Sequence, residues 1–188
     1  MEEFYMDPTR YHGRPASAAN RTEQELACYD LLDRLAVVFA RADHGHADTI
    51  EQCKRVEGVL GAPICKNLFL CNRQKTQFYL LMLAGDKVFK TKDLSKQLGV
   101  ARLSFAGPEE MREYLDVTPG SVTVLALKND RDHRVQLVID QSVAAGAQVS
   151  CHPCINTSTI LLSTRDLMDK VLPALEHEPV LVDLPWNA

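Results

Sequence analysis

The run KNLFLCNRQKTQFYLLML, residues 66–83, decides the fold. Its two parts, 66–72 and 76–83, are short, apolar and rich in leucine and aromatic side chains, which is typical of strands. The residues between them, RQK at 73–75, are polar and are too few to form a helix. The run therefore predicts two neighbouring strands linked by a short polar turn.

Helices and further strands surround this pair. Helical spacing and stop signals predict helices at 22–35, 48–61, 93–99, 108–115 and 164–175. Apolar runs predict other strands at 36–43, 123–130, 134–140, 148–152, 158–162 and 179–184, and residues 102–106 are expected to form a brief strand or a turn. Some strands follow one another directly and others are separated by helices, which indicates a mixed sheet. We therefore expect a mixed α/β (α+β) fold.

The chain is expected to hold one domain with a terminal extension. Residues 1–20 carry Pro8, Gly13 and Pro15 among polar residues, and we expect them to be loose or to drape over the domain. Residues 21–188 contain no internal repeat, low-complexity tract or linker. A chain of 188 residues suits a single domain with a full-sized core.

Composition narrows the classes of function. Hydrophobic residues make up 46% of the chain and charged residues 24%, with a net charge of −4, which is the balance of a soluble globular protein. No apolar run approaches the roughly 18 residues that a membrane span needs. The N-terminus lacks the basic and apolar parts of a secretory signal, so we expect a cytoplasmic protein. Net acidity argues against broad coating of nucleic acid but permits a small contact with a nucleic-acid end.

The stretch CHPCINTST, 151–159, raises the question of a metal or redox centre. A structural zinc site normally needs four ligands, and no second CxxC pair exists; Cys65 and Cys71 would have to complete the site. A redox pair is expected at a helix N-terminus, whereas Pro153 and the following NTST indicate a turn into a strand. We therefore interpret Cys151 and Cys154 as packing residues and expect no metal and no cofactor.

Polar side chains also occur where strands begin or end. Lys66 and Asn67 open an apolar strand, and Pro119 and Gly120 form a turn whose glycine lets backbone amides approach a ligand closely. Residues 87–102 contain five cations and one anion, which is either a solvated face or a phosphate-binding surface. Each feature alone is more often structural than functional.

The order of these stretches resembles that of the prolyl-tRNA editing family. KNLFL, DLSKQLG, RLSFA, PGSVT, NDRDHRV and HPCINTST follow one another as in this YbaK-like domain, which occurs inserted in some bacterial prolyl-tRNA synthetases and as free-standing PrdX-type deacylases. The resemblance extends from about residue 22 to residue 184. It implies a curved, barrel-like mixed sheet flanked by helices. It also implies hydrolysis of the ester that joins a wrong amino acid, chiefly alanine, to the proline tRNA.

The resemblance also implies roles for particular residues. The implied catalytic residues are Lys66, Gly120 and His152. The implied substrate-binding residues are Asn67, Ser121, Val122, Thr123, Val124, Asn129, Asn156 and Thr157. The basic run becomes a tRNA contact made by Lys87, Lys90, Lys92, Lys96 and Arg102. The implied partners are the acceptor end of aminoacylated proline tRNA and prolyl-tRNA synthetase, with no membrane and no DNA.

One position departs from the family pattern. The GxxxP loop ends in Val124 rather than proline, which frees an N–H group and is expected to relax the loop. We also expect Val124 to help line a small cavity.

The expected mechanism needs no protein nucleophile. An aminoacyl ester is already activated, and neither GxSxG nor HExxH occurs, so positioning and charge stabilisation are sufficient. A lysine ammonium is a poor base near neutral pH, so Lys66 is expected to anchor the substrate electrostatically. Amides near Gly120 would bind the carbonyl oxygen, and His152 would orient water.

Three rival functions stay open at this stage. One is a tRNA-binding or regulatory module of the same fold without activity, and another is a redox or metal sensor built on Cys151 and Cys154. The third is a deacylase for cysteine attached to the proline tRNA.

Overall fold

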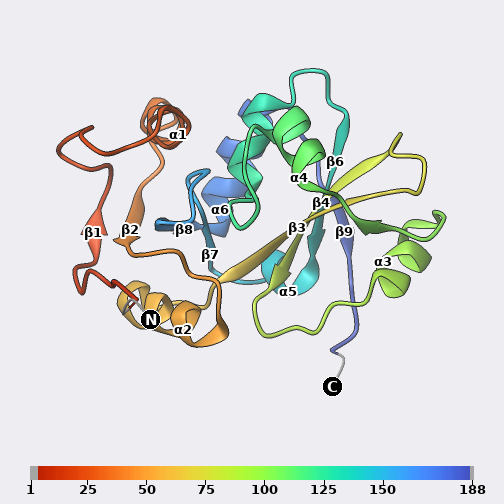
Figure 1. The fold of residues 1–188 in the computed structure, drawn as a ribbon, viewed down its shortest axis with the longest axis horizontal. Helices are drawn as coiled ribbons and strands as arrows, with labels where there is room; N and C mark the ends of the chain where they lie inside the picture. Colours follow the sequence, from red (N-terminus) through yellow and green to blue (C-terminus); the bar gives the residue numbers. More distant parts are fainter. Residues whose placement is uncertain (1–3, 187–188) are drawn as a thin grey trace.

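The strands of the computed structural model, which describes residues 4–186, form two sheets (Figure 1). The first sheet is antiparallel, in the order β1-β2-β8-β7. Its strands are β1 (Tyr11–His12), β2 (Phe39–Asp43), β7 (Gln148–Cys151) and β8 (Ser158–Ser163).

The second sheet is mixed, in the order β5-β3-β4-β6-β9. Its strands are β3 (Cys65–Cys71), β4 (Phe78–Ala84), β5 (Ser104–Phe105), β6 (Val135–Asp140) and β9 (Val180–Val182). β3 and β4 form the predicted antiparallel pair, whereas β4, β6 and β9 run parallel. The mixed α/β class is thus confirmed, with the strands divided between two sheets rather than closed into a barrel.

The five predicted helices are present. They are α1 (Glu23–Arg34), α2 (Ile50–Leu60), α3 (Thr91–Leu98), α4 (Pro108–Glu110) with its continuation η1 (Met111–Leu115), and the last helix, formed by α6 (Thr164–Asp166), η3 (Leu167–Val171) and α7 (Leu172–Ala174). The side chain of Thr22 caps α1, and Thr49 and Gln52 form a capping box on α2. A short helix, α5 (Gln141–Ala144), was not predicted.

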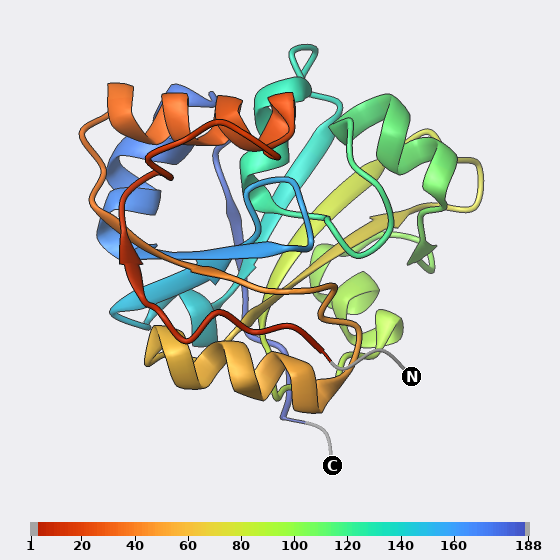
Figure 2. The same ribbon diagram turned by 60° about the vertical axis from the view of Figure 1, so that its left-hand side comes forward.

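Helices α1 and α2 lie on opposite sides of the first sheet, as Figures 1 and 2 both show. Phe39 of β2 stacks on Tyr29 of α1. Ala42, three residues along the strand, belongs to a separate apolar cluster with Val56 and Leu60 of α2. Because side chains alternate along a strand, β2 can pack against both helices.

The prediction of a strand over 123–130 is wrong. Val124–Asn129 forms a 3-10 helix, η2, and the side chain of Thr123 accepts a hydrogen bond from the Leu125 N–H at its start. Val124 and the three residues after it are all buried, and a short apolar run of this kind does not distinguish a strand from a buried helix. Asn129 and Asp130 therefore do not form a hairpin tip.

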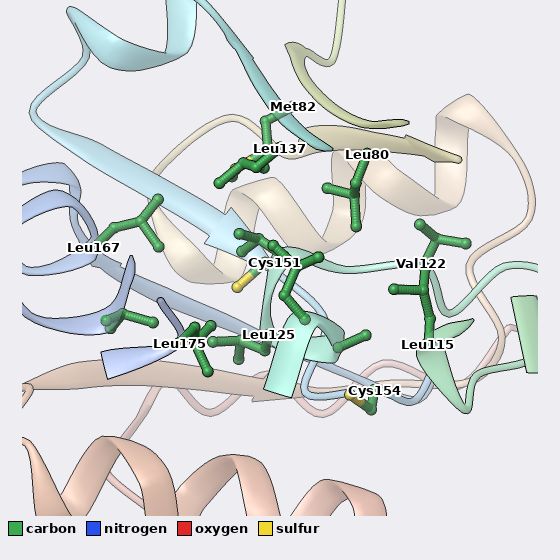
Figure 3. Close-up of a cluster of buried hydrophobic side chains, with 14 of the residues drawn as sticks. Leu80, Met82, Leu115, Val122, Leu125, Leu137, Cys151, Cys154, Leu167 and Leu175 are labelled. Carbon is green, nitrogen blue, oxygen red and sulfur yellow. The ribbon is translucent and has the colours of Figure 1, made fainter. Parts of the chain in front are cut away.

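The main hydrophobic core fills the space between the two sheets (Figure 3). Leu80, Met82 and Leu137 approach it from the second sheet, and Cys151 approaches it from β7 of the first. Leu125 of η2 packs into the same cluster, which explains why this segment is held inside the fold. The loop immediately before η2 is positioned as a result.

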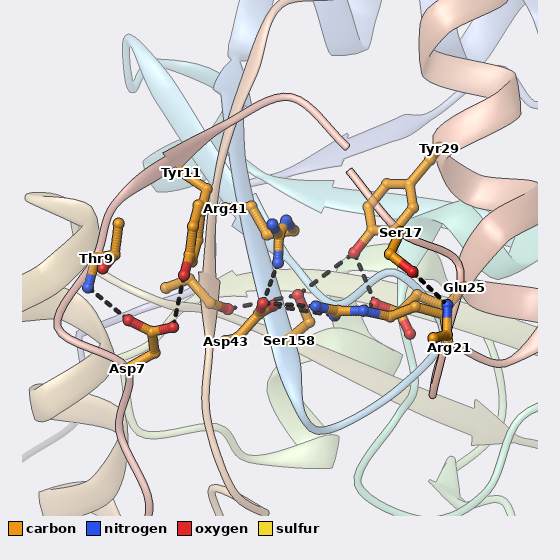
Figure 4. Close-up of polar contacts among 12 residues, drawn as sticks. Asp7, Thr9, Tyr11, Ser17, Arg21, Glu25, Tyr29, Arg41, Asp43 and Ser158 are labelled. Carbon is orange, nitrogen blue, oxygen red and sulfur yellow. Dashed lines mark hydrogen bonds and ion pairs between the residues drawn. The ribbon is translucent and has the colours of Figure 1, made fainter. Parts of the chain in front are cut away.

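The N-terminal extension packs onto the first sheet, with β1 paired to β2. Tyr11 donates a hydrogen bond to Asp7 at 2.8 Å, and the guanidinium of Arg41 lies 4.5 Å from the centre of the Tyr11 ring. Arg21 donates two hydrogen bonds to Asp43, which is also paired with Arg41 (Figure 4). The described part of the extension is thus fastened by charged groups rather than by apolar packing alone.

Asp43 makes this network sensitive to acid. Burial raises the pKa of Asp43, but hydrogen bonds from Arg21 and Arg41 outweigh it and lower that pKa to about 2. The resulting stability is present above the ordinary value of 3.8 and is lost as the pH falls through about 2. We expect Asp43→Asn to lower the free energy of unfolding at pH 7 by about 3 kcal/mol, because it leaves buried Arg41 without a counter-charge.

Denaturant titration at pH 7 and pH 2 measures this effect, and the difference between wild type and Asp43→Asn should shrink at the lower pH. The control is Asp30→Asn, which breaks an exposed pair with Arg14 and should change stability by less than about 1 kcal/mol. Equal effects of the two substitutions at pH 7 would contradict the buried network.

Candidate active site

The three predicted catalytic residues line one cavity of about 270 Å³ at the start of β3. Lys66 comes from β3, Gly120 from the loop before η2, and His152 from the turn after β7. The full lining is Ile64, Cys65, Lys66, Asn67, Leu68, Phe69, Phe105, Met111, Gly120, Val122 and His152. The fold therefore brings together residues from three distant parts of the chain, as the sequence interpretation requires.

The Lys66 ammonium is anchored but retains donor capacity. Its Nζ donates one hydrogen bond to the carbonyl oxygen of Lys87, at 3.0 Å. An ammonium carries three donors, and no other partner of Nζ is found among the described residues. Lys66 is half-buried, so its charge is screened less than that of a surface lysine.

Asn67 connects β3 to the loop that carries Gly120. Its Oδ1 accepts a hydrogen bond from the Val124 N–H at 3.0 Å. The expectation that valine in place of proline relaxes the loop is therefore wrong, because the extra N–H is used to fasten it. The Val124 side chain lies fully in the core, and Val122 is the loop valine that lines the cavity.

Gly120 adopts a conformation that suits glycine, with φ of +85°. A Cβ at this position would lie 3.0 Å from Nδ2 of Asn156. Gly120 and Val122 both line the cavity, and their N–H groups make no hydrogen bond within the part of the chain that the structure describes. They are therefore available as donors to a bound oxygen.

Asn156 supports this loop from behind. Its Oδ1 accepts a hydrogen bond from the Ala47 N–H at 3.3 Å, and its Nδ2 donates to Asp48 at 3.2 Å. Both contacts involve the segment between β2 and α2. The buried Asn156 therefore joins that segment to the wall formed by Gly120.

His152 is held as a neutral imidazole with one defined tautomer. Nδ1 is 2.9 Å from the carbonyl oxygen of Ser158, which can only accept, so Nδ1 carries the proton. Nε2 has no partner among residues 4–186 and is left as an acceptor on a residue that lines the cavity. Burial lowers the pKa of His152 to about 4, and nearby His44 acts in the same direction.

A second histidine, His44, is connected to His152 through the hydroxyl of Thr159. Thr159 Oγ1 lies 3.3 Å from His152 Nδ1 and 2.8 Å from His44 Nε2. His44 Nδ1 is 2.6 Å from the Gly45 carbonyl oxygen and so carries a proton, which leaves Nε2 to accept from the Thr159 hydroxyl. Burial also lowers the pKa of His44. The arrangement fixes the His152 ring without giving it a charge.

The lowered pKa of His152 predicts a specific pH dependence. An unfolded histidine titrates near 6.5, whereas folded His152 titrates near 4, so the unfolded state binds more protons between these values. Stability should fall as the pH drops from 6.5 towards 4, by about 3 kcal/mol from this group. His152→Asn keeps a donor near Ser158 and removes the titration, so its unfolding free energy should depend less steeply on pH.

Denaturant titrations at several pH values measure these slopes, with exposed His12→Asn as the matched control. Identical slopes for His152→Asn and wild type would show that His152 titrates normally in the folded protein.

Several predicted residues are not brought to the cavity. The Asn129 amide donates to the Leu115 carbonyl oxygen at 2.7 Å, and Thr157 uses its carbonyl oxygen to accept from the His44 N–H. Ser121 and Thr123 belong to the same loop as Gly120 and are buried. Their side chains do not line the cavity, so the predicted direct contacts with substrate find no support at these positions.

The prediction that Lys87 contacts tRNA is wrong. Its side chain is only 1% exposed and pairs with Asp140 at 2.9 Å. Asp140 also accepts a hydrogen bond from the Leu184 N–H at 2.8 Å, which ties the C-terminal segment to the pair. Lys87 therefore has a structural role that its place in a basic run concealed.

Three of the four other predicted cations line a second hollow of about 700 Å³ beside the first. Lys90, Lys92 and Arg102 line it together with Phe89 and Phe105, whereas exposed Lys96 lies on the same helix outside it. Phe105 is 60% exposed and lines both hollows. Sequence reasoning missed Phe105, Met111 and Phe69, because an apolar side chain carries no chemical sign of a binding site.

The described residues contain no group of three or more histidine, cysteine or acidic side chains that could hold a metal ion. Cys151 and Cys154 are both buried in the main core. No described helix is long and apolar enough to span a membrane.

Comparison with known proteins identifies the family of proteins to which this fold and this cavity belong. Residues 44–170 match the family model of the aminoacyl-tRNA editing domain, and the chain belongs to this family.

Two relatives show how far the similarity extends. The prolyl-tRNA editing protein ProX of Acetoanaerobium sticklandii is 32% identical over 143 residues, which cover 76% of this chain and 87% of the relative. Prolyl-tRNA synthetase associated domain-containing protein 1 of Bos taurus is 32% identical over 170 residues, covering 88% and 98%.

The fold is shared with a solved structure reported as a "putative trans-editing enzyme for prolyl tRNA synthetase". The TM-score is 0.66 at 16% identity, over 88% of this chain and 99% of the other.

Proposed function

We propose that this protein is a carboxylic ester hydrolase that removes alanine from mischarged proline tRNA. The observation that carries the proposal is the meeting of Lys66, Gly120 and His152 around one small cavity. Membership of the aminoacyl-tRNA editing family and the names of the relatives support the same reaction class. We expect the enzyme to act in the cytoplasm, where the tRNA is used.

The small cavity suits removal of a small amino acid. A synthetase pocket shaped for proline cannot strongly reject alanine, because each missing methylene changes binding by only about 1–3 kcal/mol. A second site that admits the smaller side chain corrects this error. Here Val122, Phe69 and Met111 supply apolar walls for such a side chain.

The chain's own groups are sufficient for hydrolysis by water. The N–H groups of Gly120 and Val122 donate to the ester carbonyl oxygen and stabilise the negative charge that develops on it. The ammonium of Lys66 holds the phosphate or ester oxygens of the terminal adenosine. His152 Nε2 accepts a hydrogen bond from the attacking water and orients it. The free ribose hydroxyl of the substrate assists proton transfer to the leaving oxygen.

The basic hollow beside the cavity fits the acceptor end of the tRNA. Lys90, Lys92 and Arg102 offer charges to phosphates, and the exposed Phe105 offers a ring face for a base at the border of the cavity. A protein that touches only the acceptor end needs few phosphate contacts, so its net acidity is no obstacle.

Charge reversal at this surface should weaken tRNA binding. We expect Lys90→Glu and Lys92→Glu together to raise the Kd for proline tRNA about tenfold, and added salt to weaken binding of the wild type in the same way. Filter binding at several salt concentrations measures both effects. The control is charge reversal of exposed Lys54 on α2, which shows whether the loss of any positive charge weakens tRNA binding. Equal binding of tRNA by all variants at low salt would contradict the assignment of this surface.

A deacylation panel tests the proposed function. Proline tRNA charged with alanine, cysteine or proline is incubated with the protein, and the remaining aminoacyl-tRNA is measured over time. We expect rapid release of alanine and little release of proline. Release of cysteine instead would identify the alternative substrate, and tRNA binding without any release would identify an inactive module. Repeating the panel with added prolyl-tRNA synthetase tests whether that partner matters.

A further inference from the structure

Two buried cysteines meet beside the candidate site. Cys28 of α1 and Cys154 of the turn between β7 and β8 are 126 residues apart in sequence, yet their sulfur atoms lie 3.5 Å apart. The Cys28 thiol donates a hydrogen bond to the Cys154 sulfur. No hydrogen bond joins Cys154 to Cys151 among the described residues, so the contact does not follow the CxxC spacing.

We propose that Cys28 and Cys154 form a site of reversible oxidation, at which a peroxide converts the two thiols into a disulfide that alters the neighbouring cavity. A disulfide needs a sulfur–sulfur distance of about 2.0 Å, so the atoms must approach by about 1.5 Å. The effect on the cavity rests on the proposed deacylase function, whereas the oxidation site does not.

Cys154 lies in the turn between β7 and β8, close in sequence to two groups of the candidate site (Figure 3). It lies between His152, whose ring lines the cavity, and Asn156, whose amide stands behind Gly120. Its φ is +62°, a left-handed conformation that non-glycine residues seldom adopt, so the turn is tightly specified. Movement of the Cys154 sulfur towards α1 is therefore expected to displace His152 and Asn156, which lie two residues before and after it.

Cys154 is the thiol suited to react first. Cys28 is fully buried, whereas Cys154 is 8% exposed. The hydrogen bond from Cys28 lowers the pKa of the Cys154 thiol, and the positive charge of Lys128 acts in the same direction. The same hydrogen bond raises the pKa of Cys28, and burial adds to this. The pair thus contains one reactive sulfur and one resolving thiol.

The reaction balances with one peroxide for each disulfide. The Cys154 thiolate attacks a peroxide oxygen, so that an S–O bond forms, the O–O bond breaks, and hydroxide leaves and takes a proton to become water. The Cys28 sulfur then attacks the Cys154 sulfur, the S–O bond breaks, and the second water leaves with the Cys28 proton. Two electrons pass from the thiols to the peroxide, and a dithiol returns them.

The test uses the full chain and reads the bond by mass. Wild-type protein is treated with hydrogen peroxide, remaining thiols are alkylated, and the digest is searched for the peptide that links Cys28 to Cys154. The deacylation rate is measured before oxidation, after oxidation and after dithiothreitol. We expect the linked peptide to appear, kcat/KM to fall about tenfold, and dithiothreitol to restore it.

Cys28→Ala should keep the basal rate and lose less of it in peroxide, because Cys154 can be oxidised but the disulfide cannot form, whereas Cys53→Ala, which removes a half-buried cysteine of α2, should be as sensitive as wild type. Absence of the linked peptide in oxidised wild type overturns the proposal even if Cys28→Ala fails to fold. An unchanged rate in the linked protein, or equal inactivation of Cys28→Ala, overturns its effect on the cavity. If wild type deacylates none of the charged tRNAs, the proposed function fails while the linked peptide still decides the oxidation site.

Discussion

Replacing Lys66 with alanine is expected to lower kcat/KM for alanine release from proline tRNA by about 10²- to 10³-fold. The substitution removes the cationic side chain of a residue that lines the cavity together with Gly120 and His152. No other cation lines this cavity within the described residues, so no neighbouring charge can replace it.

The loss should be chemical rather than structural. Lys66→Ala removes a single hydrogen bond, from Nζ to the Lys87 carbonyl oxygen, and should change the free energy of unfolding by about 1 kcal/mol. Single-turnover deacylation and denaturant titration separate the two effects. The control is Lys170→Ala, which removes a lysine paired with Asp166 on the last helix. A rate for Lys66→Ala within threefold of the control would remove the lysine from the mechanism.

Replacing Gly120 with alanine is the second large expected effect. The added Cβ would lie 3.0 Å from Asn156 Nδ2, so Asn156 or the loop must give way by a few tenths of an ångström, and φ of +85° strains an alanine. In the proposed mechanism, such a shift displaces the N–H groups of Gly120 and Val122 from the oxyanion that they would stabilise. We expect kcat/KM for alanine release to fall about 10- to 100-fold, since a misplacement of about 1 Å costs about 100-fold and a smaller one costs less.

Gly13→Ala is the matched control for backbone strain. Gly13 has φ of +75°, and a Cβ there would meet nothing within 4 Å. Both substitutions should destabilise the fold by about 1 kcal/mol, and only Gly120→Ala should slow the reaction. A comparable fall in rate for both variants would mean that general destabilisation, and not the cavity wall, explains the effect.

Local pattern predicted the elements on which the fold depends. The apolar runs of β3 and β4 act over a few residues, and the structure confirms the two strands that they predicted. The same reasoning failed at 124–129, where an uninterrupted apolar run has no period that would distinguish a strand from a helix. Tertiary packing beneath the loop made it a 3-10 helix.

The residues of the candidate site were also predictable only in part from the sequence. Lys66, Gly120 and His152 could be selected from sequence because polar residues and glycine in ordered motifs resemble a known family. The same motifs also pointed to Asn129 and Lys87, which the fold uses for other contacts. Apolar walls such as Phe105 gave no signal, because burial and exposure depend on neighbours far away in the chain.

Short-range chemistry, read from the order of the residues, was enough to predict the class of fold and most of its helices and strands, whereas the three groups of the cavity were implied by the resemblance to a known family. Long-range contacts decided the rest: the separation into two sheets, the neutral state of His152, the use of the Val124 N–H and the meeting of Cys28 with Cys154. The physical reason is that hydrogen bonding, desolvation and close packing depend on distance in space, which the distance along a chain does not specify.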